Sequence, residues 1–473
     1  MGLTRRELVG RAAGSALAGT GIYALVDRLV AAPPARAAVR VPLLPEQHVL
    51  QNLRIVVSDG VEVFAPPLHS AVVTATLRVD ETRGALAEAR VRLEHALEQL
   101  DGRFSATPSG LGVTVGWGLP YFERYVPGQA RRRLPIDRRA SRSRGRPVRA
   151  LEDAIRFPSD PESVILEQND VAVLLRSDSL AHIQHATEAL FGGSGDLFAV
   201  TSIRRGFAGG GFAGRQSLPK QMAMAAKIPG AESIPDAAEL FLGFTSTQKQ
   251  APGRYRITNF ETLGYTDVRT GGYFAHGTNM HLSHLFEDLE AWYGTFTRDE
   301  RVESTFSPGL RIGPDILTVG QGPEQAAGEA DVLRGYRRHG RIGHSGSIQP
   351  ASRLQQRVIG PDGTRYEQGT PIPHRADFNT LDHPFAWTRD GHRDGFAESP
   401  RAGLHFVVFN PTSDDFRRGR LAMDGALPSG RVVDVGQRSR RQGFNDVLAT
   451  THRQNFLVPP RRHRSFPLSE LPA

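Results

Sequence analysis

The 473-residue sequence has no cysteine, only three lysines and only three tryptophans. Without cysteine the chain can form no disulfide, no thiolate nucleophile, no zinc–cysteine site and no iron–sulfur cluster. Any bound metal must therefore be held by His, Asp, Glu or a prosthetic group. Hydrophobic residues make up 39% of the chain and charged residues 23%, which is typical of a folded globular protein of two or three domains.

Long apolar runs are also lacking, since no stretch approaches the roughly 20 residues of a membrane-spanning helix. The run at 12–26 is short and glycine-rich. It follows Arg5 and Arg6 and precedes Ala-Arg-Ala at 35–37, so residues 1–37 resemble a twin-arginine (Tat) export signal with its cleavage site. We expect the Tat translocon to export a soluble protein to the periplasm or cell exterior. The alternative is an ordinary basic N-terminus leading into an amphipathic helix.

The net charge of +8 is concentrated in a few segments. Residues 131–149 alone hold nine arginines and one aspartate. Nucleic-acid binding favours basic residues that alternate with stacking aromatics or lie on one helix face, and this run has neither arrangement. We therefore expect a disordered, solvated surface loop here, and no nucleic-acid partner.

Hydrophobic periodicity indicates two similar units. Period-2 alternation predicts strands at 69–79, 110–118, 170–178 and 197–207, and period-3.6 spacing predicts helices at 82–102 and 179–193. The order is β-α-β, a long insertion, and β-α-β, which is a ferredoxin-like pattern.

The second half follows a similar plan with longer irregular segments. An apolar segment at 238–244 is followed by a strand-like segment at 271–282, a helical one at 282–296, an irregular region at 305–400 and a strand at 403–411. The predicted fold class is α+β, with two ferredoxin-like halves of the dimeric α/β-barrel kind. The predicted divisions are 1–37 for the signal, 38–235 and 236–430 for the halves, and 431–473 for an irregular tail.

Segments in chain order resemble the DyP-type (dye-decolourising) haem peroxidases. They are GLGVTVGWGLPYFERY (110–125), QNDVAVLLRSDSLAHIQHATEALF (168–191), ELFLGFTSTQ (239–248), GGYFAHGTNMHLSHLFEDLEAWY (271–293) and GHRDGFAESPRAGLHFVVFNPTSDDF (391–416). The resemblance implies two ferredoxin-like halves with haem b in the second. It also implies hydrogen peroxide and an unidentified reducing substrate as partners, and leaves assembly into homo-oligomers open.

The resemblance further implies an aspartate and an arginine on the distal side of the haem. The carboxylate would move a proton during O–O cleavage, and the arginine would stabilise the developing negative charge. Ser246 stands at the aspartate position, and Arg393 fits the arginine position. Serine is no base near neutral pH unaided, so the sequence predicts a peroxidase-like protein whose proton shuttle is missing.

A proximal histidine is the remaining group that the resemblance implies. Ungapped alignment of the segment TPIPHRADFNTLDHP places Phe378 at the ligand position, whereas a small loop shift would bring His374 there; His383 is a third choice. With His374 as axial ligand, residues 374–395 would wrap the haem and supply the distal Arg393. If Phe378 replaces the ligand, haem would bind weakly or not at all.

Two other classes of function stay open from the sequence. The same scaffold could be a non-catalytic haem or porphyrin carrier. Alternatively, a haem-free metal protein could use His276, His281 and His284, because the last two would share a helix face if a helix begins near residue 280. His339 and His344 lie in a glycine-rich stretch that predicts a flexible loop.

Overall fold

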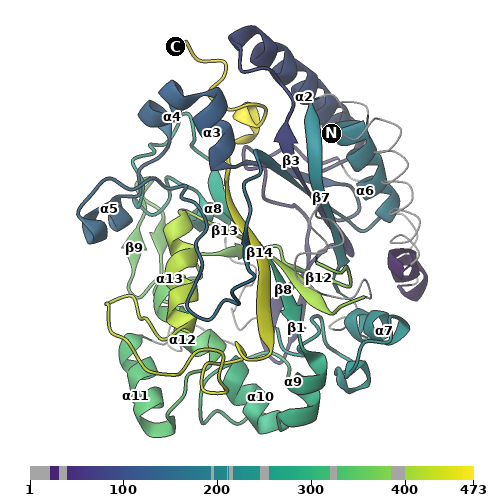
Figure 1. Cartoon of the computed structure of the whole chain (residues 1–473), viewed down its shortest axis with the longest axis vertical. Helices are drawn as coiled ribbons and strands as arrows, with labels where there is room; N and C mark the ends of the chain where they lie inside the picture. Colours follow the sequence, from purple (N-terminus) through teal and green to yellow (C-terminus); the bar gives the residue numbers. More distant parts are fainter. Residues whose placement is uncertain are drawn as a thin grey trace.

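The computed structural model describes residues 22–30, 40–192, 197–209, 211, 217–245, 255–319, 328–384 and 400–472. Its centre is a ten-stranded mixed sheet that curves around on itself, with helices on its outer side (Figure 1). Two further two-stranded sheets, β1–β2 and β10–β9, lie apart from it.

The strands are β1 (Arg54–Ser58), β2 (Val61–Ala65), β3 (His69–Leu77), β4 (Gly112–Trp117), β5 (Ile165–Leu166), β6 (Val171–Ser177), β7 (Phe198–Phe207), β8 (Thr278–Glu287), β9 (Val358–Ile359), β10 (Arg365–Tyr366), β11 (His374–Arg375), β12 (Phe378–Thr380), β13 (Gly403–Asn410) and β14 (Leu448–Val458).

The central sheet closes into a ring. Going round it, the strands are β3, β6, β4, β14, β8, β13, β12 and β7, and β7 pairs with β3 again. Strand β5 pairs with β14, and β11 pairs with β13 in the same register as β12. Each half contributes four ring strands in ferredoxin-like order, β7-β3-β6-β4 and β14-β8-β13-β12. This confirms the predicted fold class.

Two seams join the halves. At one, Leu457 of β14 pairs with Trp117 of β4. At the other, Asn379 of β12 pairs with Phe207 of β7. The Asn379 side chain accepts a hydrogen bond from the Phe241 amide (3.2 Å) and donates one to the Glu239 carbonyl (3.0 Å). Asn379 therefore ties the seam to the segment that enters the second half.

The helices are α2 (Arg83–Arg103), α3 (Leu119–Tyr125), α4 (Pro127–Arg133), α5 (Arg138–Arg144), α6 (Leu180–Thr187), α7 (Leu218–Ala225), α8 (Tyr255–Thr258), α9 (Leu289–Thr295), α10 (Arg298–Thr305), α11 (Glu329–His339), α12 (His344–Ser352) and α13 (Ser413–Met423). A further helix covers residues 22–29.

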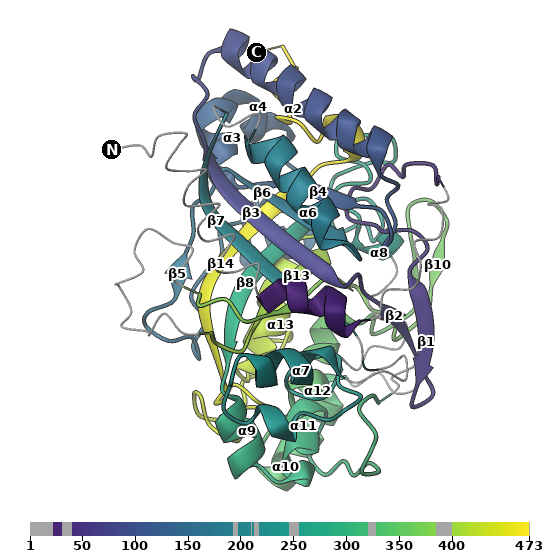
Figure 2. The ribbon, with the colours of Figure 1, turned by 90° about the vertical axis from the view of Figure 1, so that its right-hand side faces the viewer.

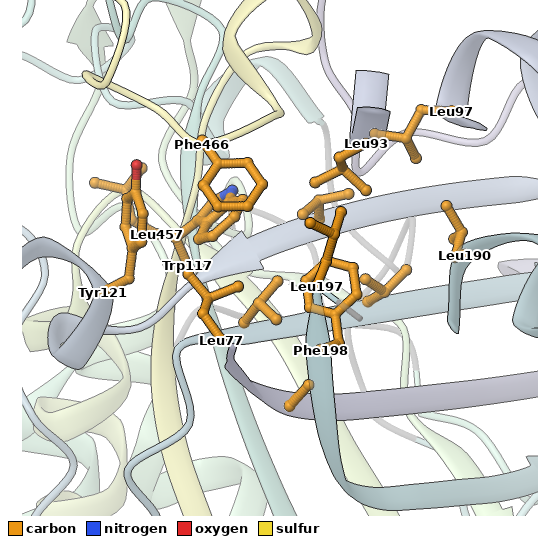
Figure 3. Close-up of a cluster of buried hydrophobic side chains, with 14 of the residues drawn as sticks. Leu77, Leu93, Leu97, Trp117, Tyr121, Leu190, Leu197, Phe198, Leu457 and Phe466 are labelled. Carbon is orange, nitrogen blue, oxygen red and sulfur yellow. The ribbon is translucent and has the colours of Figure 1, made fainter. Parts of the chain in front are cut away.

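Helices α2 and α6 cover the outer face of the first half (Figure 2). Thr82 caps α2 by accepting a hydrogen bond from the Ala85 amide, and α2 buries an apolar stripe that includes Leu93 and Leu97. These leucines pack with outward-facing strand residues such as Trp117 (Figure 3). Removing this apolar surface from water is what holds helices and strands together.

The predicted strands and helices of the first half are confirmed, whereas two predictions in the second half are wrong. Residues 278–287 form strand β8, and only 289–295 of the predicted helix is helical. The predicted irregular tail contains β14, which pairs with β8 along its length inside the ring. The second repeat therefore extends to residue 458.

The prediction of a disordered loop at 131–149 is also wrong. Asp137 caps α5, and the helix lies against the start of α13. Arg139 pairs with Asp415 at 2.7 Å and stacks on the Tyr265 ring at 4.3 Å. Arg144 pairs with acids from α13 and from its own loop. Part of the arginine run thus neutralises acids inside the protein. The run has no periodic pattern from which this role could be predicted.

Part of the predicted export signal packs on the folded domain. In the helix at 22–29, which lies beside α7 (Figure 2), Tyr23 and Val26 are buried in a core shared with α7 and α9. The Tyr23 hydroxyl donates to Asp382 (2.9 Å), and Asp27 pairs with His69 (2.7 Å). Among the described residues, no helix is both long and apolar enough to cross a membrane. Tat export and cleavage stay predictions.

We expect Arg139→Ala to lower the free energy of unfolding by about 3 kcal/mol, because it leaves the buried Asp415 without its counter-ion. Arg142→Ala, on the same helix but exposed, should change it by less than about 0.5 kcal/mol. Denaturant unfolding measures both changes. Equal values for the two variants would show that α5 is not anchored through Arg139.

Candidate functional site

Of the two cavities that have Leu240 and Thr245 in their walls, the larger lies between the sheet and helices α12 and α13. Its volume is about 200 Å³. Alternation along β13 turns Leu404, Phe406 and Val408 into this cavity and places His405 on the opposite face, inside the ring. The wall is mostly apolar and includes residues 240, 242, 244 and 245 of the segment that resembles the distal motif.

Glu287, the last residue of β8, is an acidic group in this cavity. Its side chain is buried, and its Oε2 atom has no hydrogen-bond partner in the described part of the chain. Burial raises the pKa of Glu287 to about 8, and the nearby charge of Asp377 adds to the effect. At neutral pH this carboxyl is therefore mostly protonated and can donate a proton.

His344 is the histidine in the cavity wall. It is the first residue of α12, and its ring stacks on Phe444 with 4.1 Å between ring centroids. Burial, with smaller contributions from Arg375 and Arg420, lowers the pKa of His344 to about 3, so the imidazole is neutral. Gly343 precedes it because a Cβ there would lie 2.5 Å from the Phe306 carbonyl oxygen.

The prediction that His344 lies in a flexible loop is therefore wrong. Helix α12 contains Pro350, which hides the helix in the sequence. The sequence signal for the start of this helix was a glycine followed by a histidine.

Three arginines of the cavity wall are already paired with acids. Arg375 is bound by Asp377, with one hydrogen bond of 3.0 Å. Arg453 pairs with Asp160 at 2.6 Å, and Arg420 pairs with Asp424 at 2.8 Å. An anionic group in the cavity would have to share these guanidinium groups with their present partners.

His374, the favoured proximal ligand, does not line the larger cavity. It lies next to Arg375 in β11, so the two side chains point to opposite sides, and His374 lines a second cavity of about 120 Å³. Burial and the charge of Arg176 lower the pKa of His374 to about 3. Its Nδ1 atom has no hydrogen-bond partner among the described residues.

The other predicted haem residues lie elsewhere or outside the described residues. Phe378 is buried inside the ring, 5.1 Å from the His405 ring. His383 is buried near His284, whose pKa its charge helps to lower. Ser246 and Arg393 both lie outside the described residues.

The helix-face arrangement of His281 and His284 is wrong, because β8 is a strand and an odd spacing places them on opposite faces. His281 stacks on Phe416 of α13, whereas His284 points into the ring. His276 binds Glu46 at 2.9 Å, beyond the strand. In the described ranges no group of three His, Asp or Glu side chains could hold a metal.

A histidine cluster inside the ring was not found from the sequence. His405 and His452 both lie opposite His284, on the strands that flank β8. Burial lowers the pKa of all three, and Arg204, which pairs with Glu167, lowers each further. They are therefore neutral. They come from three strands far apart in sequence, and only the ring brings them together.

Residues 67–460 match a family of unknown function, DUF7405. The chain belongs to that family. Among curated proteins, none matches. Solved structures share the fold at low identity. DtpA from Streptomyces lividans, solved as an oxyferrous complex, has a TM-score of 0.54 and 17% identity over 91% of this chain and 96% of that one. A DyP-type peroxidase from Cellulomonas bogoriensis has a TM-score of 0.52 and 17% identity over 88% and 96%. This member of DUF7405 therefore shares the fold of the DyP-type peroxidases.

The raised pKa of Glu287 has a measurable effect on stability. Between its ordinary pKa of 4.5 and about 8, the unfolded chain has released a proton that the folded protein keeps, so stability falls as pH rises through this range. Glu287→Gln has no such proton. Its free energy of unfolding relative to wild type should therefore rise from about pH 5 to about pH 8 and then level off.

Urea unfolding at a series of pH values measures this difference. Glu290→Gln, at an exposed carboxylate of α9, is the control and should show no such trend. If the difference in unfolding free energy between Glu287→Gln and wild type does not change with pH, Glu287 ionises normally in the folded protein.

Proposed function

We propose that this DUF7405 protein is an exported, DyP-type peroxidase-like haem protein with reduced catalytic capacity, and that haem b binds in the larger cavity. The observation that carries the proposal is the apolar cavity between the sheet and α12/α13, with a neutral histidine in its wall. Export rests on the sequence of residues 1–37 alone.

The side chains of the wall suit a porphyrin chemically. Haem is several times larger than the benzene that a cavity of roughly 150 Å³ takes, so the wall would have to open to admit it. Leu240, Leu242 and Phe406 would contact its faces, and His344 would offer an imidazole to the iron. Arg375, shared with Asp377, would contact the carboxylates of the group. When bound, haem would supply the iron on which peroxide is reduced. Glu287 would hold a proton at its carboxyl group, and the apolar walls would exclude water.

Reduced capacity is part of the proposal because of Ser246. A serine replaces the expected shuttle, and Glu287, though acidic, is protonated at neutral pH and so is a poor base. Hydrogen peroxide and a reducing substrate would still be the partners. The second candidate is a non-catalytic haem or porphyrin carrier, which the existing acid partners of Arg375, Arg420 and Arg453 favour.

Haem titration tests the cavity. Added haem should give wild-type protein a Soret band and an iron–histidine vibration by resonance Raman. His344→Ala should weaken both, because it removes the imidazole from the cavity wall. His374→Ala, at a buried histidine of the other cavity, is the matched control and should leave both intact. The reverse result would assign the ligand to His374, and no Soret band in wild type would overturn the proposal.

Ser246→Asp tests the missing shuttle. If haem is bound, the new carboxylate should raise peroxide turnover by about 10²–10⁴-fold, the usual contribution of a general acid–base group. Ser246→Asn has a similar size but no acid and should give no increase. Turnover with a reducing dye and the Soret band are measured on the same samples. No increase in Ser246→Asp with an intact Soret band would point to the carrier function.

A further inference from the structure

The smaller cavity, at the end of the ring near β11, contains a buried arginine. Arg176, at the end of β6, is 5% exposed and lines this cavity together with His374. It donates one hydrogen bond, from Nη2 to the His48 carbonyl (2.7 Å), and its Nε atom has no partner. Burial lowers the pKa of Arg176 only to about 10, so the guanidinium stays charged at neutral pH.

Arg176 has no carboxylate counter-ion in the described part of the chain. Two acids line the same cavity, but Asp377 is engaged by Arg375, and Glu239 forms no ion pair with Arg176. Two other buried arginines differ, because Arg204 pairs with Glu167 and Arg453 pairs with Asp160. Burying a charge without a partner is costly, and arginine is rarely buried unless paired. Arg176 therefore lacks an anionic partner among the described residues.

The remaining walls indicate what kind of anion fits. Leu53, Val63, Phe64, Pro66 and Pro67 form an apolar side of the cavity. A guanidinium presents two parallel N–H donors that match a carboxylate. The volume of about 120 Å³ is below the roughly 150 Å³ of a cavity that takes benzene. The apolar part of the ligand should accordingly be a short aliphatic chain.

We infer that this cavity is a binding site for a short-chain aliphatic monocarboxylate, held by Arg176 through its carboxylate and by the apolar wall through its chain. His374 lies beside the arginine, and its neutral ring can donate one N–H to the same carboxylate. The site shares Leu240, Thr245 and Arg375 with the proposed haem cavity, but its test needs no haem.

Butyrate is the probe, with thermal unfolding and calorimetric titration as readouts at constant ionic strength. Butyrate should raise the unfolding midpoint in a concentration-dependent way, because it binds only the folded protein. Acetate should bind about tenfold more weakly, since it lacks two methylene groups. Butyramide, a neutral analogue of similar shape, should give no shift. A shift with butyramide equal to that with butyrate would overturn the inference.

Substitutions of Arg176 test where butyrate binds. Arg176→Met should abolish the butyrate shift and, without butyrate, unfold no earlier than wild type, because an unpaired buried charge has been removed. Arg176→Lys keeps the charge but loses the planar pair of N–H donors of the guanidinium. It should weaken the affinity for butyrate at least about tenfold. The exposed Arg78→Met is the control and should keep the full shift. An undiminished shift in both Arg176 variants, or a response to phosphate but not butyrate, would contradict the proposed site.

Discussion

Closure of the strand ring is the constraint on which the rest of the structure depends. A sheet with free edges would leave backbone donors and acceptors unpaired, whereas here each half supplies the neighbour that the other lacks. Closure also divides every ring strand into an inner and an outer face. Leu404 and His405 thus face different environments although they are neighbours in sequence.

The inner face is unusually polar for such an enclosed space. Apolar residues such as Phe378 and Phe409 share it with neutral histidines and with the Arg204–Glu167 pair. Neutral imidazoles avoid the large cost of burying charge. Arg204, the buried cation among these residues, is paired with Glu167. Arg176, at the other end of the ring, differs from Arg204 in having no acid partner among the described residues, and a missing anion accounts for this difference.

The sequence predicts the first half well because its strands and helices each have one clear period and its two crossovers are short. It fails where a residue pattern is ambiguous or where partners are distant. The β8 segment contains a helix-like spacing of histidines, yet pairing with β13 and β14 makes it a strand. Helix α5 has no apolar stripe, and its burial depends on acids of α13 that lie some 270 residues away.

The candidate site was harder to predict for the same reason. Resemblance could name a segment for the axial ligand, but it could not show that Arg375, and not His374, reaches the larger cavity. His344, which no periodic pattern singled out, is the histidine that faces the apolar cavity. The two cavities nevertheless share Leu240, Thr245 and Arg375 as wall residues. A ligand that drew Arg375 away from Asp377 in one cavity would leave an unpaired carboxylate in the wall of the other, so occupancy of the two sites should be energetically linked.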